Sequence, residues 1–130
     1  MAAGTLNFTI EQGATFNLLL TWEIDTVPVN LTVLHHPTIA EFAEWCAENE
    51  TPIIGIDNVP GSKHLEGAEL PEKCVLLFGQ EGAGMSDEGI AICDVLYAIE
   101  QYGSTRSMNA SAAGAIAMYH WALQHLPRKI

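Results

Sequence analysis

Two short polar stretches combine residue types that suit the binding of a small ligand. Residues 79–84 read Gly-Gln-Glu-Gly-Ala-Gly, and their three glycines allow backbone angles and close approaches that a side chain would forbid. Glu81 is the charged group of this stretch. Residues 107–109 read Ser-Met-Asn and offer a hydroxyl and an amide just before a predicted helix. Together these stretches could form a crevice with backbone and side-chain hydrogen-bonding groups.

The elements around these stretches predict that they meet. Residues 75–78 and 95–99 are apolar runs typical of buried parallel strands, and each precedes one of the two stretches. Ser86 is a suitable N-cap for a helix after the glycine loop, and residues 110–125 predict one long helix. Because open parallel sheets bind ligands at the carboxyl ends of their strands, we expect the crevice at that edge.

The preceding part of the chain supplies further elements of the same kind. Residues 29–35 and 52–57 predict strands, and Thr38 opens a capping box at the start of a helix between them. A loop is expected over residues 58–71. The order from residue 29 predicts an α/β fold with a mostly parallel sheet flanked by helices. Asp57, at a strand end, is a candidate for ligand contact or for capping of the loop.

The first 28 residues have a different pattern. Apolar and polar residues alternate over residues 6–10 and again over residues 16–24, with a turn between them. This period of two predicts an antiparallel β-hairpin. We therefore divide the chain into an atypical hairpin segment, residues 1–28, which is a foreign or divergent start, and a main domain, residues 29–130.

Three segments resemble a known family: LLFGQEGAGMS, CDVLYAI and STRSMNASAAGAIAMY. They are similar to the second and third motifs of the SpoU/TrmH family of the SPOUT superfamily, and the resemblance covers roughly residues 33–126. Members of that family are RNA 2′-O-ribose methyltransferases that use S-adenosylmethionine. The resemblance implies a trefoil-knotted α/β fold, a tRNA or rRNA substrate and a homodimer.

The resemblance also assigns roles to individual residues. It implies cofactor contacts from Phe78, Gly79, Glu81, Gly82, Gly84, Ile99, Gln101, Ser107, Met108 and Asn109. Asn109, Glu81 and Arg106 are the catalytic candidates, although Arg106 does not match the position of the family's catalytic arginine. Two structural alternatives stay open: Glu81 could hold its own turn, and Ser107 and Asn109 could cap the last helix.

Two departures from the family pattern affect the expected function. Ile99-Glu100-Gln101 stands where the family often has Ile-Pro-Met, and the first motif, with its catalytic arginine, is absent. The prediction is an S-adenosylmethionine-dependent RNA methyltransferase domain that is incomplete. The alternatives are a non-catalytic module that binds the cofactor or a partner, and a chimeric fragment that mainly associates with itself.

Composition limits the possible partners. Sixteen acidic residues against five basic ones give a formal net charge of −11, which opposes binding to a phosphate backbone. Lys63 and Arg106 are expected in loops beside the crevice.

No apolar run is long enough for a membrane span, so a cytoplasmic protein is expected. Its three cysteines lack metal-ligand spacing and are read as buried reduced thiols.

Two further features of the sequence are weighed as structural or binding elements. His35 and His36 could bind a metal, but no third ligand stands at a recognisable spacing, so we predict no metal site. Met118, Tyr119, Trp121, Ala122 and Leu126 form an apolar helix face that fits either a dimer interface or the core.

Overall fold

A five-stranded parallel sheet forms the centre of the molecule. The computed structural model describes residues 6–10, 23–24, 27–28, 36–105 and 107–128. The sheet has the order β1-β6-β4-β7-β5, and every neighbouring pair is parallel. Its strands are β1 (Leu6–Ile10), β4 (Ile53–Ile56), β5 (Lys63–His64), β6 (Cys74–Phe78) and β7 (Val95–Ala98). The helices are α1 (Ile39–Glu48), α2 (Asp87–Ala91) and α3 (Ala110–His125), and β2 (Glu23–Ile24) pairs antiparallel with β3 (Val27–Pro28).

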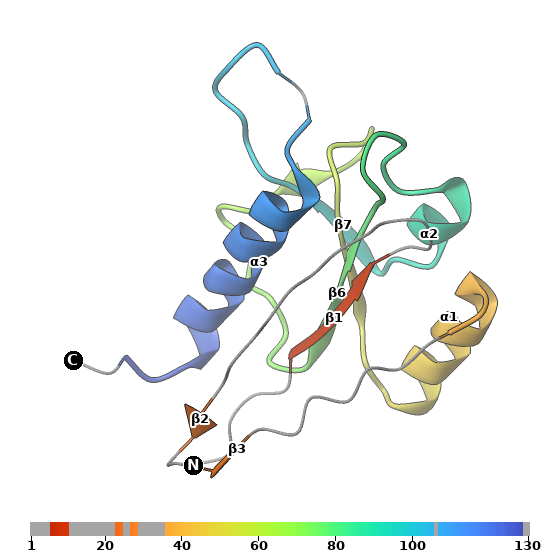
Figure 1. Ribbon diagram of the computed structural model, residues 1–130, viewed down its shortest axis with the longest axis vertical. Coiled ribbons are helices and arrows are strands. Elements are labelled where there is room, and N and C mark those ends of the chain that lie inside the picture. Colours follow the sequence, from red (N-terminus) through yellow and green to blue (C-terminus); the bar gives the residue numbers. More distant parts are fainter. Residues whose placement is uncertain (1–5, 11–22, 25–26, 29–35, 106, 129–130) are drawn as a thin grey trace.

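Helices cover both faces of this sheet, with α3 on one side and α1 and α2 on the other (Figure 1). All five residues of β6 are buried, which explains why this strand is an unbroken apolar run. Its side chains alternate between two cores. Leu76 and Phe78 pack with Trp121 of α3, while Val75 and Leu77 pack with Phe42 of α1.

The helix starts follow the predicted capping residues. The Thr38 hydroxyl accepts a hydrogen bond from the Glu41 amide at 3.1 Å, and the Ser86 hydroxyl accepts one from the Gly89 amide at 3.0 Å. Each bond satisfies an amide that has no partner within its helix. The prediction of one long helix over residues 110–125 is confirmed by α3.

The first half of the chain differs from the prediction in two places. β1 joins the main sheet beside β6, with Leu6 opposite Cys74, a pairing that the hairpin prediction did not include. The hairpin's second strand, residues 16–24, lies mostly outside the described residues, as does the predicted strand over residues 29–35. The predicted loop over residues 58–71 contains β5, so Lys63 belongs to an edge strand. The domain boundary at residue 28 stays a prediction.

Helix α3 carries no Asp, Glu, Lys or Arg, and it presents two apolar faces. Gly114, Ala117 and Trp121 are buried against the sheet. Ile116, Tyr119 and Leu123 lie on the exposed face. Of the predicted interface residues, Trp121 is buried and three others pack against the core: Met118, Ala122 and Leu126. Only Tyr119 of that set is exposed, so packing accounts for most of that face. No described helix has the length and apolar character needed to cross a membrane.

The cysteines give a testable difference in reactivity. Burial raises the pKa of Cys46 to about 11, with a further contribution from the charge of Asp94, and burial raises that of Cys74 to about 11. Cys93 is only half-buried. Only the thiolate form reacts, and for a pKa near 11 the thiolate fraction at pH 8 is about 0.1%. We therefore expect iodoacetamide to label Cys93 first. Peptide mass spectrometry checks the order, and prompt labelling of Cys74 in folded protein would contradict it.

Candidate cofactor-binding site

A cleft of about 310 Å³ lies at the carboxyl ends of the central strands, beside the start of α3. Three parts of the chain that are distant in sequence line it: residues 56–59 at the end of β4, residues 78–85 at the end of β6, and, beyond β7, Ile99, Gln101, Ser107, Met108, Ala110 and Ala113. Because β6, β4 and β7 are neighbours in the sheet, their carboxyl ends bring these segments together. The cleft predicted from the glycine loop and the Ser-Met-Asn stretch is therefore present.

The glycine loop is a tight turn in which the backbone contacts itself. Gln80 and Gly84 exchange two backbone hydrogen bonds, of 3.2 and 3.0 Å. Gly82 and Gly84 have φ angles of +84° and +74°, a region that favours glycine. A Cβ on Gly79 would lie 2.2 Å from the Met85 amide nitrogen and 2.3 Å from the Gly84 carbonyl carbon. The turn thus requires glycine at position 79 because of this close contact, and its backbone angles favour glycine at positions 82 and 84.

Asp57 holds the far end of this loop. Its Oδ2 accepts a hydrogen bond from the Met85 amide at 2.8 Å, and its Oδ1 accepts one from the Asn58 amide at 2.8 Å. Asp57 is also part of the cleft lining. The loop-capping alternative is therefore realised, and the same carboxylate lies where a ligand could contact it.

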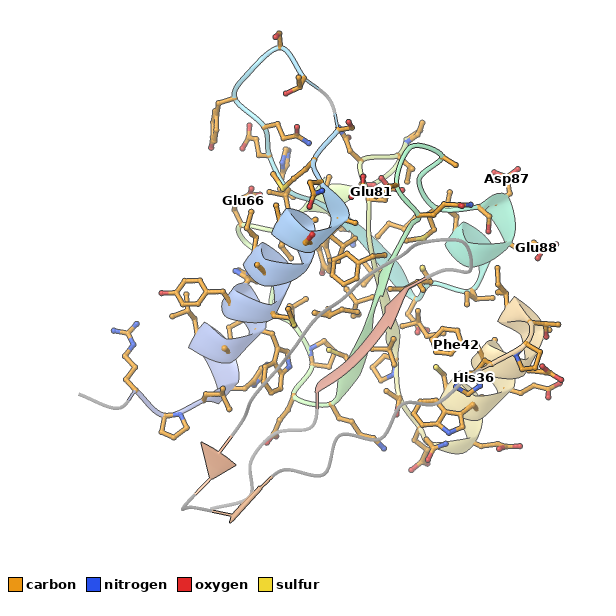
Figure 2. The ribbon with its side chains drawn as sticks, viewed as in Figure 1. His36, Phe42, Glu66, Glu81, Asp87 and Glu88 are labelled. Atoms are coloured by element: carbon orange, nitrogen blue, oxygen red, sulfur yellow. The ribbon has the colours of Figure 1, made fainter. Side chains whose placement is uncertain are left out.

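Glu81 joins the glycine loop to the last helix. Its Oε1 accepts a hydrogen bond from the Ala110 amide at 2.7 Å, although the side chain is largely exposed. Figure 2 shows Glu81 between the loop and the start of α3. A carboxylate suits this place because the first amides of a helix are unpaired and carry a partial positive charge. This hydrogen bond of Glu81 is therefore to the start of α3 and not to an amide of its own turn.

The Ser-Met-Asn stretch divides its roles. Asn109 caps α3, since its Oδ1 accepts hydrogen bonds from the Ser111 amide at 2.9 Å and the Ala112 amide at 3.3 Å. Ser107 and Met108 line the cleft instead. Arg106, a catalytic candidate, lies outside the described residues. The capping alternative is therefore confirmed for Asn109.

Nearly the whole predicted cofactor set lines one cleft. All of its ten members except Asn109 do so: Phe78, Gly79, Glu81, Gly82, Gly84, Ile99, Gln101, Ser107 and Met108. The sequence did not reveal the contributions of Ile56, Asn58 and Val59, of Met85, or of Ala110 and Ala113. Ile56, Asn58 and Val59 could have been expected from the predicted strand end at Asp57. The small residues at 110 and 113 stand one helical turn apart and leave room beside the loop.

The charges of the cleft are negative. Asp57 and Glu81 are in its lining, and no lysine or arginine is among the described lining residues. Lys63, expected beside the crevice, is not in the lining. The site therefore favours a ligand with a positive charge. Outside the lining, on the loop after β7, the charge of Glu100 and a hydrogen bond to it raise the pKa of Tyr102, and the charge of Glu66 adds to this effect.

His36, the described member of the histidine pair, packs against aromatic rings. Its ring centroid lies 5.4 Å from that of Phe42 and 5.6 Å from that of Trp45. These contacts pack it against α1 (Figure 2), and it is not among the residues that line the cleft. His35 lies outside the described residues. The geometry of His36 supports a packing role.

Solved structures with this arrangement define the class of protein. The SpoU methyltransferase AviRb of Streptomyces viridochromogenes, in complex with AdoMet, is 29% identical, with a TM-score of 0.61 over 68% of this chain and 35% of that one. A structure on 2-OH methylation of C/U34 on tRNA is 28% identical, with a TM-score of 0.60 over 68% of this chain and 57% of that one. The fold is that of SpoU-type methyltransferases.

A family model places the chain within that class. The model of the SpoU rRNA Methylase family matches residues 27–119, and the chain belongs to this family. A tRNA (guanosine(18)-2′-O)-methyltransferase of Borreliella burgdorferi is 40% identical over 67 residues, which are 52% of this chain and 31% of that protein. The enzyme of the same description from Saccharomyces cerevisiae is 28% identical over 89 residues, which are 68% of this chain and 6% of that protein. The chain thus spans a minor part of these relatives.

Proposed function

We propose that this chain is the S-adenosylmethionine-binding domain of a tRNA or rRNA 2′-O-ribose methyltransferase. The observation that carries the proposal is the single cleft that gathers the glycine loop, the Ile99–Gln101 segment and the Ser107–Met108 pair. The family match and the AdoMet complex of a 29% identical SpoU methyltransferase support the choice of ligand.

The volume and charge of the cleft suit this cofactor. Its volume of about 310 Å³ lies at the small end of the range of ligand pockets, roughly 300–1,000 Å³. Gly79 and Gly84 let the loop fold tightly beside the cleft, since a Cβ on Gly79 would meet the loop's own backbone and one on Gly84 would lie 3.1 Å from Asp57 Oδ2. Asp57 and Glu81 complement the positive sulfonium of the cofactor. When bound, the cofactor would supply an electrophilic methyl group to a ribose oxygen.

The residues of this chain would bind and orient rather than supply a base. Glu81 fixes the glycine loop against α3, and Asp57 fixes its other end, so that the cleft keeps its shape without a ligand. Such pre-organisation contributes much of the rate of a transfer that needs an in-line geometry. Asn109 and Arg106 remain our candidates near the ribose. The general base of the family, the arginine of the first motif, has no counterpart in residues 1–62, which contain no lysine or arginine.

The net charge of −11 supports a role in which this chain binds the cofactor but does not itself bind the RNA. A chain with this balance binds phosphate backbones poorly, because contacts from lysine and arginine provide most of the affinity for nucleic acids. We therefore assign RNA capture and the activating arginine to a further chain segment or partner. A non-catalytic cofactor-binding module is the second candidate, favoured by the same charge and by the missing first motif.

Three further properties belong to the proposal. The loops at residues 79–84, 99–104 and 107–109 would form the trefoil knot that the family resemblance implies. A homodimer would use the exposed face of α3, where Ile116 is 41% and Tyr119 65% exposed, because this helix lacks the charges that repel a second copy elsewhere. The three free cysteines favour a cytoplasmic location.

Calorimetric titration tests the proposal directly. We expect saturable binding of S-adenosylmethionine and S-adenosylhomocysteine, with one site per chain. ATP, which carries the same nucleoside with a polyanionic tail, is the control ligand and should not bind the negative cleft. A folded chain that binds neither sulfur compound would refute the proposed function. Binding without methyl transfer to total tRNA and rRNA is the result that both candidate functions expect of this chain alone, because neither assigns it the activating arginine.

A further inference from the structure

A histidine and two glutamates converge at the edge of the sheet, outside the cleft. The ligand atoms of His64, Glu66 and Glu100 all lie within 4.8 Å of one another, and all three side chains are exposed. They come from two segments, the β5 edge and the loop after β7. No other group of this kind occurs among the described residues.

The sheet itself brings these residues together. β5 and β7 are parallel, with His64 opposite Ala98, and the Leu65 amide donates to the Ala98 carbonyl at 3.0 Å. β5 ends at His64, so Glu66 lies in the turn that follows it, and Glu100 lies just beyond the end of β7. Leu65, between His64 and Glu66, is buried, which anchors this turn to the sheet. The pairing of β5 with β7 and the hydrogen bond from the Glu100 amide to Glu66 therefore bring the three side chains together.

The local contacts hold the two carboxylates close despite their like charges. Glu66 Oε1 accepts a hydrogen bond from the Glu100 amide at 2.8 Å, and Glu100 Oε2 accepts one from the Tyr102 hydroxyl at 3.3 Å. Within the described part of the chain, neither carboxylate forms an ion pair with lysine or arginine. Both side chains are exposed, and each places a carboxylate oxygen within 4.8 Å of a ring nitrogen of His64.

We propose that His64, Glu66 and Glu100 form a binding site for one divalent transition-metal cation, with Zn²⁺ as the best fit. An imidazole nitrogen with two carboxylate oxygens suits zinc, whose bonds to these atoms are about 2.0–2.2 Å. Small rotations of exposed side chains close separations of up to 4.8 Å around one ion. Water completes the coordination on the open side. The Tyr102 hydroxyl orients a ligand in the manner of outer-shell groups in known metal sites.

The position of Glu100 links this site to the cleft. Its neighbours on either side, Ile99 and Gln101, both line the cleft. A cation that ties Glu100 to the β5 edge therefore also fixes the segment that forms one wall. We infer that the bound cation tightens cofactor binding. This coupling rests on the proposed function, whereas the metal site itself is independent of that function.

Titration of the untagged 130-residue chain with ZnCl₂ tests the site without any cofactor. We expect one saturable site, and a dissociation constant raised at least about tenfold in both His64→Ala and Glu100→Gln, since a lost ligand costs no less than an outer-shell partner. Glu88→Gln removes an exposed carboxylate of α2 (Figure 2) and is the matched control, expected to bind like the unsubstituted chain. MgCl₂ should not compete, because magnesium disfavours imidazole.

Each outcome bears on one part of the proposal. Equal zinc affinity in His64→Ala and in the unsubstituted chain would overturn the site and assign the metal to other histidines. Circular dichroism verifies folding, and exposed substitutions should change stability by no more than about 0.5 kcal/mol. If zinc binds as expected but leaves the affinity for S-adenosylmethionine unchanged, the coupling is wrong and the metal site stands. If the cofactor never binds, the zinc titration still decides the site.

Discussion

Replacing Gly79 with alanine should abolish cofactor binding. The added Cβ would lie 2.2 Å from the Met85 nitrogen and 2.3 Å from the Gly84 carbonyl carbon, and both are backbone atoms that cannot rotate away. The turn must therefore open, and the cleft wall moves with it. We expect S-adenosylmethionine affinity to fall by at least about 100-fold, equivalent to about 2.7 kcal/mol. The free energy of unfolding should fall by about 1–3 kcal/mol, as for other overpacked sites.

Two other glycines provide graded controls for this variant. Gly67→Ala meets nothing within 4 Å and has an ordinary backbone angle, so binding and stability should stay unchanged. Gly82→Ala also meets nothing, but its φ of +84° should cost about 1 kcal/mol of stability while binding persists. Calorimetric titration and urea unfolding measure both quantities. If Gly79→Ala binds as well as Gly67→Ala, the loop geometry described above does not govern the site.

Replacing Trp121 with alanine should remove a large share of the protein's stability. The side chain is 1% exposed in the core between α3 and β6, and its indole nitrogen donates to the Pro71 carbonyl at 3.0 Å. Loss of a buried tryptophan costs about 3–5 kcal/mol, compared with a total of about 5–15 kcal/mol for a typical domain. We expect a reduction of this size in urea unfolding followed by circular dichroism.

Two variants separate packing from hydrogen bonding at this position. Trp121→Phe keeps most of the ring volume but leaves the Pro71 carbonyl without its indole donor, at a cost of about 1–3 kcal/mol. Tyr119→Ala removes a large side chain that is 65% exposed on the same helix and should change stability by less than about 0.5 kcal/mol. A loss below about 1 kcal/mol for Trp121→Ala would show that α3 packs differently.

Local signals in the sequence were sufficient for the elements that build the cleft. The apolar run at 75–78 (observed as β6), the caps at Thr38 and Ser86 and the extent of α3 all follow from patterns within a few residues. The roles of Glu81 and His64 depend on contacts across 29 and 34 residues or more, which no local pattern contains. The same holds for β1, whose alternation suited a hairpin but whose partner is β6. An alternating pattern predicts that a segment forms a strand, but which strand it pairs with depends on the rest of the sheet.

The hydrogen bond from Ala110 to Glu81 also bears on when the site can exist during synthesis. A nascent chain that stops before Ala110 contains the complete glycine loop, but the loop then lacks the helix end that its carboxylate contacts. Contacts of such separation form late, because the intervening chain must first be ordered. The cofactor would thus stabilise only chains whose last helix has emerged, which makes ligand binding a marker of completed translation.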